Sequence, residues 1–282
     1  MTVNRPFGYA NKLFMFEEIE KKVVEVKQRI VDAALRSGRS GDDVLMVAVS
    51  KYAEPNDGVV ESFLRAGIRN LAENRPQMFL SKVEYLRSSG NWDYRGPKAF
   101  VSPSQKECES DNSLRWHFIG NLQRNKVRRI LPYTTLIHSI DSWKLLQTID
   151  RILEEESCTP EESVQEVFPD NVSVLLEVHI SNDDTKQGFS HDEVKKILAN
   201  VDRLKHIEVV GLMGMAGLTA TSDEIRRQFA SLRRTLEECR SLFPELVKFR
   251  ELSMGMSGDF EIAIEEGATI VRIGSSLYPE GS

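Results

Sequence analysis

The chain has 282 residues, and its 37 Lys and Arg against 43 Asp and Glu give a formal net charge of -6. This balance creates no overall field that would attract nucleic acid or an anionic membrane. The three cysteines, Cys108, Cys158 and Cys239, lie far apart without metal-ligand spacing, so we expect no metal and a reducing cytoplasm. We find neither a secretory leader pattern nor an apolar run near the roughly 20 residues that cross a bilayer.

Taken in chain order, the first predicted element is a helix over residues 13–36, where apolar residues recur at spacings of three and four. Short apolar runs then alternate with helical patterns. Eight runs are predicted as strands: Val44–Ser50, Ile68–Ala72, Arg115–Ile119, Thr135–Ser139, Val172–His179, His206–Leu212, Lys248–Leu252 and Thr269–Ile273. Helices are predicted between them at residues 56–66, 75–87, 121–131, 142–156, 190–199, 222–240 and 257–266.

The alternation predicts an α/β fold made of one domain over residues 1–282. Several runs are nearly continuous in apolar residues, which is typical of parallel strands covered on both faces. Eight strands alternating with helices indicate a (β/α)8 TIM barrel with an extra N-terminal helix. Residues 88–113, rich in Ser, Gly, Pro and charge, are predicted to form a surface insertion, and residues 157–171 a second excursion.

Lys51 follows the first predicted strand. Because side chains alternate along a strand, Val47, Val49 and Lys51 share one face. If the two valines fill the barrel, Lys51 lies at its upper mouth, where active sites of such barrels are found. Partial loss of hydration favours the neutral amine, which can form a Schiff base with an aldehyde. A solvated lysine at the end of a strand is the alternative.

Two small-residue turns follow the last two predicted strands, at Ser253–Asp259 and Arg272–Ser276. Their glycines let the backbone approach an anion closely, and their serines add hydroxyl donors. Ser257 is predicted to begin the helix 257–266, whose first amides also favour an anion. Either turn alone fits an ordinary loop, but together they predict a phosphate site. With Lys51, this suggests pyridoxal 5'-phosphate.

Arg272 interrupts the apolar residues of the last strand. A buried guanidinium needs an acceptor, which is either a neighbouring carboxylate or the ring nitrogen of the cofactor. Because arginine keeps its proton, it would leave that nitrogen unprotonated and limit carbanion chemistry. His117 and His138 also lie in predicted strands, and for each a hydrogen-bonded core histidine is as good an interpretation as a catalytic one.

Several longer motifs resemble those of a known family, the pyridoxal-phosphate homeostasis proteins. These are single-domain barrels related to the N-terminal domain of bacterial alanine racemase. The resemblance covers most of the chain, and its most specific motifs are Trp116-His117-Phe118-Ile119-Gly120 and Ser253-Met254-Gly255-Met256-Ser257. Departures from the family pattern include Tyr52, residues 71–72, residues 179–184 and residues 214–217, which ring the predicted mouth.

The resemblance implies a cofactor-binding set. Lys51 would hold pyridoxal 5'-phosphate as a Schiff base, and Asn74 would lie near the ring. Arg272 would contact the ring nitrogen, and Ser257, Gly274 and Ser275 the phosphate. Family members are thought to act in cofactor homeostasis, by buffering or delivering it to pyridoxal-phosphate-dependent apoenzymes, with little or no catalysis. Alanine racemases carry an additional β domain that this sequence lacks, so we expect a monomer.

Two other functions fit parts of the pattern. One is a pyridoxal-phosphate-dependent amino-acid racemase of low efficiency, whose second acid or base would be His117, Tyr52 or Tyr278. The other is a barrel that acts on a phosphorylated metabolite, with Lys51 as an aldolase-type amine. The cofactor-binding homeostasis protein is the function that the sequence favours, because it uses the full set of anchors.

Overall fold

The structure is a computed structural model that describes residues 9–89, 99–103, 113–158, 166–181 and 187–279. In these residues eight parallel strands close into a barrel in sequence order, with β8 pairing with β1. The strands are β1 (Leu45–Val49), β2 (Asn70–Glu73), β3 (Arg115–Phe118), β4 (Thr134–Ile140), β5 (Val172–Glu177), β6 (Ile207–Met213), β7 (Glu251–Ser253) and β8 (Ile270–Ile273). The predicted α/β barrel is confirmed.

Helices connect the strands and cover the outside of the barrel. They are α1 (Tyr9–Arg36), α2 (Val59–Arg65), α3 (Pro76–Ser88), α4 (Val127–Ile130), α5 (Trp143–Ser157), α6 (His191–Leu198), α7 (Ser222–Leu242) and α8 (Phe260–Glu265). Short 3-10 helices are η1 (Gly41–Asp43), η2 (Arg124–Lys126), η3 (Leu131–Tyr133), η5 (Val201–Arg203) and η6 (Ser275–Leu277).

One predicted helix, at residues 121–131, is largely wrong. Only the four residues of α4 are α-helical, and they lie between η2 and η3. Pro132 lies in the first turn of η3. Because proline has no amide proton and restricts the residue before it, it ends the α-helix there.

The core has two layers, one on each side of the barrel wall. The inner layer fills the barrel and consists of Val47, Val49, Ala72, Leu136, Leu175, Val210, Met213 and Ile270. The outer layer lies between strands and helices and includes Ala48, Leu71 and Val271. Val47 and Val49 therefore face inward, as strand alternation predicted, and Val47 pairs with Arg272 across β1 and β8.

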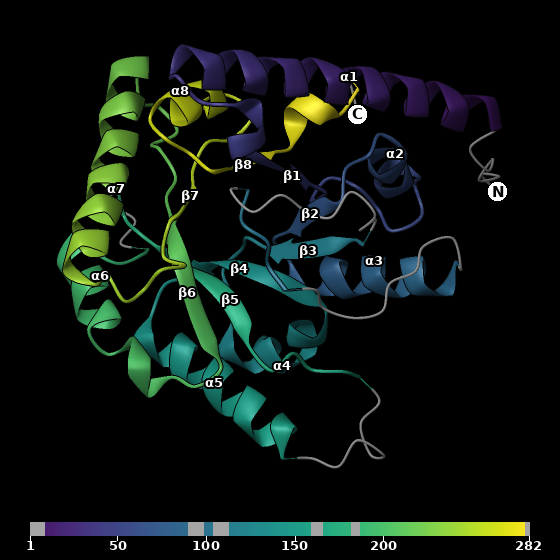
Figure 1. Cartoon of the computed structure of the whole chain (residues 1–282). Coiled ribbons are helices and arrows are strands. Elements are labelled where there is room, and N and C mark those ends of the chain that lie inside the picture. Colours follow the sequence, from purple (N-terminus) through teal and green to yellow (C-terminus); the bar gives the residue numbers. More distant parts are fainter. Residues whose placement is uncertain (1–8, 90–98, 104–112, 159–165, 182–186, 280–282) are drawn as a thin grey trace.

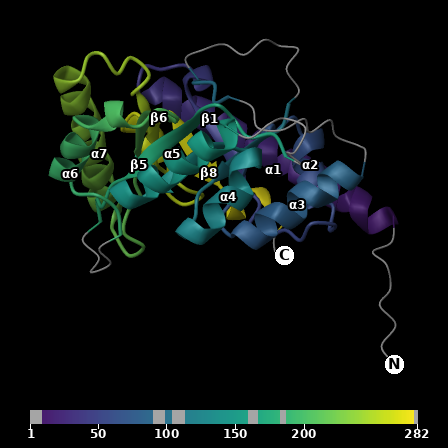
Figure 2. The ribbon, with the colours of Figure 1, turned by 90° about the horizontal axis from the view of Figure 1, so that it is seen from below.

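The helices surround the barrel in groups. In both views α6 and α7 lie together on one side, and α2 and α3 lie on the opposite side (Figures 1 and 2). The predicted N-terminal helix is confirmed as α1, which crosses the molecule beside α2 and α8 (Figure 1). Its buried stripe, Ile19, Val23, Val26 and Ile30, explains why it packs there rather than lying free.

The predicted insertion at residues 88–113 lies mostly outside the described residues. Within its described part, Phe100 packs against the inner core layer and lies edge-on to the His117 ring. Ser102 donates a hydrogen bond to Glu251, at the first residue of β7. This stretch therefore contacts the end of the barrel where the strands begin.

Candidate functional site

A cavity of ≈ 490 Å³ opens where the strands end, which is the face used for active sites in TIM barrels. The structure brings all six predicted site residues to this cavity. Its lining consists of Val49, Lys51, Tyr52, Asn74, Ile119, Gly120, Asn121, Ser139, Glu177, Gln187, Met215, Met256, Ser257, Gly258, Arg272, Gly274 and Ser275. Residues from both ends of the sequence meet here because β8 closes the barrel against β1.

Lys51 lies two residues after the end of β1 and is half-buried in the cavity wall. Its ammonium group is 4.9 Å from the centre of the Tyr52 ring. That ring packs edge-on against Tyr278, whose hydroxyl donates a hydrogen bond to the Val49 carbonyl. The aromatic pair thus braces the end of the strand that carries the amine.

The two predicted turns meet at one hydroxyl group. Ser257 Oγ accepts hydrogen bonds from the amides of Gly274, at 3.1 Å, and Ser276, at 3.2 Å. Gly255 has φ of +91°, and a Cβ there would lie 2.6 Å from the Ala263 Cβ, so this turn requires glycine. Hydrogen bonds therefore join the turns after β7 and β8, and together these turns form one side of the cavity wall.

Helix α8 begins at Phe260 rather than at the predicted residue 257. Its N-cap is Asp259, whose carboxylate accepts a hydrogen bond from the Met256 amide and holds the chain in a turn before the helix starts. Ser257 therefore belongs to the turn and not to the helix. The amides placed around its hydroxyl come from the loop after β8 instead.

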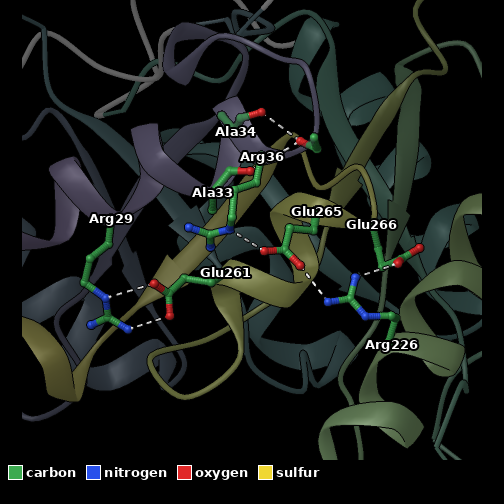
Figure 3. Close-up of polar contacts among 9 residues, drawn as sticks. Arg29, Ala33, Ala34, Arg36, Arg226, Glu261, Glu265 and Glu266 are labelled. Carbon is green, nitrogen blue, oxygen red and sulfur yellow. Dashed lines mark hydrogen bonds and ion pairs between the residues drawn. The ribbon is translucent and has the colours of Figure 1, made fainter.

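Ion pairs attach α8 to its neighbours. Arg29 and Arg36 of α1 pair with Glu261 and Glu265, and Arg226 of α7 reaches Glu265 and Glu266 (Figure 3). These groups are partly exposed, so each pair contributes little by itself. Together they connect this six-residue helix, which directly follows the Ser257 turn, to α1 and α7.

Arg272 is only 3% exposed, yet it lines the cavity. It donates hydrogen bonds to Ser253 Oγ at 2.7 Å and to the Gly214 carbonyl at 3.2 Å. Burial lowers its pKa to about 10, while Asp259 and Glu177 act in the opposite direction. The guanidinium stays charged at neutral pH and is oriented by neutral acceptors rather than by a direct carboxylate pair.

Asn74 directly follows β2. Its side-chain oxygen is buried and has no hydrogen-bond partner within the described ranges, although it belongs to a cavity-lining residue. Gly120 lies so close that a Cβ on it would approach the Asn74 carbonyl oxygen to 2.0 Å. A buried acceptor without a partner is what a bound molecule with a donor group would satisfy.

A buried ion pair, which the sequence did not reveal, supports the Lys51 and Asn74 side. Lys82 of α3 is 1% exposed, and its ammonium lies 2.5 Å from Glu73 Oε2 and 2.6 Å from the Ser50 carbonyl. Glu73 Oε1 accepts a hydrogen bond from the Asn74 amide. The pair therefore connects the residue before Lys51 to the residue before Asn74.

Glu177, the last residue of β5, is a second residue that the sequence did not reveal. It is 4% exposed, lines the cavity, and its Oε2 has no hydrogen-bond partner in the described part of the chain. Burial raises its pKa to about 7, assisted by Asp141 and opposed by Arg272. A carboxyl group at the end of a mostly apolar strand, two residues after inward-facing Leu175, was the available signal.

The three acid or base candidates of the racemase hypothesis differ in whether they line the cavity. Tyr52 lines the cavity, but His117 and Tyr278 are buried and are not part of its wall. His117 is hydrogen-bonded to Asn70 and His138 inside the barrel. Burial lowers its pKa to about 3, with Arg115 acting in the same direction, so it is neutral at physiological pH.

The described residues lack two features, a metal-binding cluster and a membrane-spanning helix. They contain no cluster of three or more His, Cys, Asp or Glu side chains arranged to hold a metal ion. None of their helices combines the length and the apolar character needed to pass through a bilayer.

Comparison with known proteins defines the class. Residues 46–280 match the alanine racemase N-terminal domain family, to which the chain therefore belongs. More narrowly, it belongs with the pyridoxal phosphate homeostasis proteins. The member from Aquifex aeolicus (strain VF5) is 32% identical over 262 residues, which cover 92% of this chain and 97% of that protein.

Solved structures agree with this placement. An unknown protein from Bifidobacterium adolescentis is 32% identical, covers 98% of each chain, and superimposes with a TM-score of 0.79. PipY of Synechococcus elongatus PCC7942, solved with pyridoxal phosphate bound, is 28% identical with a TM-score of 0.66. The match covers 90% of this chain and 100% of PipY.

Proposed function

We propose that this protein binds pyridoxal 5'-phosphate as a Schiff base on Lys51. One observation carries the proposal: Lys51, Arg272 and the joined turns at Ser257 and Gly274 line a single cavity. When bound, the cofactor supplies an aldehyde carbon that reacts with a primary amine. Lys51 is the described lysine that lines the cavity.

The same cavity wall also holds suitable partners for the phosphate and the ring nitrogen of the cofactor. The Ser257 hydroxyl accepts hydrogen bonds from the amides of Gly274 and Ser276, so its own proton can be donated to a phosphate, and Gly274 and Ser275 lie beside it in the cavity wall. Arg272 supplies a donor for an unprotonated ring nitrogen. Asn74 contributes an acceptor without a partner in the described ranges. The residue types thus fit each functional group of the molecule.

The biological role that we propose is intracellular homeostasis of this cofactor, in which the protein buffers it or delivers it to pyridoxal-phosphate-dependent apoenzymes. Support comes from relatives that carry this name over nearly their whole length, and from PipY with the cofactor bound. An arginine at the ring nitrogen disfavours the electron withdrawal that carbanion chemistry needs. Little or no catalysis is therefore expected. We also propose that the protein acts as a cytoplasmic monomer, which sedimentation analysis can test.

A low-efficiency amino-acid racemase remains the second candidate, because Tyr52 and Glu177 line the cavity and Glu177 holds a proton near neutral pH. Solvent deuterium exchange at the α-carbon of common amino acids decides between the two. Exchange that depends on Lys51 would favour the racemase, and absence of exchange would remove it.

Absorbance spectroscopy tests the proposed binding. Wild-type protein mixed with pyridoxal 5'-phosphate should develop the visible band of an imine, and Lys51→Ala should not. Lys144→Ala, which removes an exposed lysine of α5, is the matched control and should behave as wild type. A wild-type protein that stays colourless after prolonged soaking would refute the proposal.

A further inference from the structure

A continuous row of polar side chains crosses the interior of the barrel. His117 Nε2 lies 3.0 Å from Asn70 Oδ1, and His117 Nδ1 lies 2.9 Å from His138 Nε2. His138 Nδ1 lies 2.8 Å from Ser253 Oγ, which accepts a hydrogen bond from Arg272. All five residues are at most 8% exposed. The row therefore links β2, β3, β4 and β7 to the guanidinium that lines the cavity.

The register of the sheet explains why these residues meet. His117 pairs with inward-facing Ala72 and Leu136, and Ser253 pairs with inward-facing Met213 and Ile270. Neighbouring residues in register face the same side of a sheet, so both side chains enter the barrel. Five strands thus contribute polar groups to an interior that apolar side chains otherwise fill, so each of these groups needs a hydrogen-bond partner inside the barrel.

Only one arrangement of protons gives every group in the row a partner. Arg272 can only donate, so Ser253 Oγ accepts from it and donates its own proton to His138 Nδ1. His138 must then carry its proton on Nε2 and donate to His117 Nδ1. His117 likewise carries its proton on Nε2 and donates to Asn70 Oδ1. In the reverse arrangement Ser253 would receive two donors, and its own proton would have no acceptor in the row.

We propose that His117 and His138 are positioning residues for Arg272. Through their fixed tautomers they hold Ser253 as the acceptor that orients the guanidinium at the cavity. Ser253 Oγ accepts a hydrogen bond from one terminal nitrogen of Arg272, and the Gly214 carbonyl accepts one from the other. These two hydrogen bonds fix the plane of the guanidinium. The relevance of this positioning to cofactor binding rests on the proposed function, because Arg272 is the group expected at the ring nitrogen.

The charge state of the row follows from its surroundings. Burial lowers the pKa of His138 well below its ordinary value, and His117 and Arg272 act in the same direction. A second proton on His138 would turn Nδ1 into a donor aimed at Ser253, in competition with Arg272. The hydrogen bond from Arg272 to Ser253 therefore requires neutral imidazoles, and a charged His138 would disrupt it.

The tautomers can be read directly by nitrogen-15 NMR of the full-length, ligand-free protein. We expect both His117 and His138 to be neutral with the proton on Nε2 at pH 7, and to remain so at pH 5. Signals of the other histidines are identified by His179→Gln, His191→Gln and His206→Gln. A proton on Nδ1 of either ring, or a charged ring at pH 7, would overturn the proposal.

The effect on the site is tested with Ser253→Ala, which removes one hydroxyl and breaks the row next to Arg272. We expect the dissociation constant for pyridoxal 5'-phosphate to rise about tenfold and the imine band to shift. The control is Thr135→Val, which removes a buried hydroxyl of β4 that has no hydrogen-bond partner in the described ranges. It should bind as wild type.

Unchanged affinity and an unchanged band in folded Ser253→Ala would overturn the proposal. If the variant does not fold, the tautomers of the wild type decide. If wild-type protein takes up no cofactor, the proposed function fails, whereas the NMR result still decides whether the histidines orient Arg272. The two failures are therefore distinguishable.

Discussion

On the side of the mouth formed by β7, β8 and β1, the cavity wall includes loop backbone, serines and two cationic side chains, Lys51 and Arg272. On the side formed by β2 to β5, the charges Glu73 and Lys82 pair behind the wall, and Glu177 has an oxygen without a described partner. The first side carries groups suited to bind a ligand. On the second side, the Glu73–Lys82 pair connects the residues before Lys51 and Asn74 without lining the cavity itself.

The largest expected effect comes from Lys82→Met, which leaves the Glu73 carboxylate buried without its partner. Breaking one half of a buried pair costs about 3–5 kcal/mol, because the remaining charge is desolvated and unpaired. We expect a loss of this size in the free energy of unfolding, measured with urea. Lys82→Met with Glu73→Gln should recover much of the loss, and exposed Lys144→Met should lose little. A double variant no more stable than Lys82→Met would contradict the role assigned to the pair.

The next effect concerns Glu177, whose pKa is raised from 4.5 to about 7 by burial. Between these values the folded chain keeps a proton that the unfolded chain has released. This residue's contribution to stability is therefore complete below pH 4.5, falls as the pH rises to 7, and is constant above that.

Relative to Glu177→Gln, the wild type should thus lose about 3 kcal/mol of unfolding free energy over this range. Urea unfolding of ligand-free protein at several pH values measures the difference. Glu245→Gln, at an exposed position, should follow the wild type. A difference between wild type and Glu177→Gln that does not change with pH would show that the carboxyl group is ionised in the folded chain.

A smaller effect is expected at the joined turns. Ser257→Ala removes the hydroxyl that accepts the amides of Gly274 and Ser276. The dissociation constant for pyridoxal 5'-phosphate should rise about tenfold, which is about 1.4 kcal/mol. Binding of pyridoxal, which has no phosphate, should hardly change. Equal weakening of both ligands would mean that the turns do not bind the phosphate.

The smallest effect is expected behind those turns, at the ion pairs of α8. Glu265→Gln removes the partner of Arg36 and Arg226. Because these groups are partly exposed and screened by water, the loss of unfolding free energy should stay below about 1 kcal/mol and shrink at high salt. A loss of several kcal/mol that persists at high salt would show that α8 depends on these pairs.

The same contrast explains which parts were predictable from the sequence. The ligand-facing side was predictable because Lys51 ends an apolar run and because glycine and serine mark its turns. The supporting side was not, because one charged residue in an apolar pattern does not show its partner. Lys82 lies three residues after Phe79 and four before Leu86, which places it on the buried stripe of α3, but only the fold brings Glu73 to it.

The barrel itself was predictable from the alternation of apolar runs and helical patterns, and local details were not. Helix α4 is short because a 3-10 helix precedes it and Pro132 follows it, and α8 starts late because Asp259 accepts a hydrogen bond from the Met256 amide and holds residues 256–259 in a turn. The roles of His117 and His138 were left open, since their meeting depends on the register between β3 and β4. Register is a property of the closed sheet and cannot be read from one strand.

Borohydride reduction followed by peptide mass mapping tests the central claim most directly. After incubation with pyridoxal 5'-phosphate, we expect one reduced cofactor per chain, attached to the peptide that contains Lys51. Lys82, which is 1% exposed and paired, should carry none. Attachment spread over exposed lysines with Lys51 unmodified, or no attachment at all, would contradict the account.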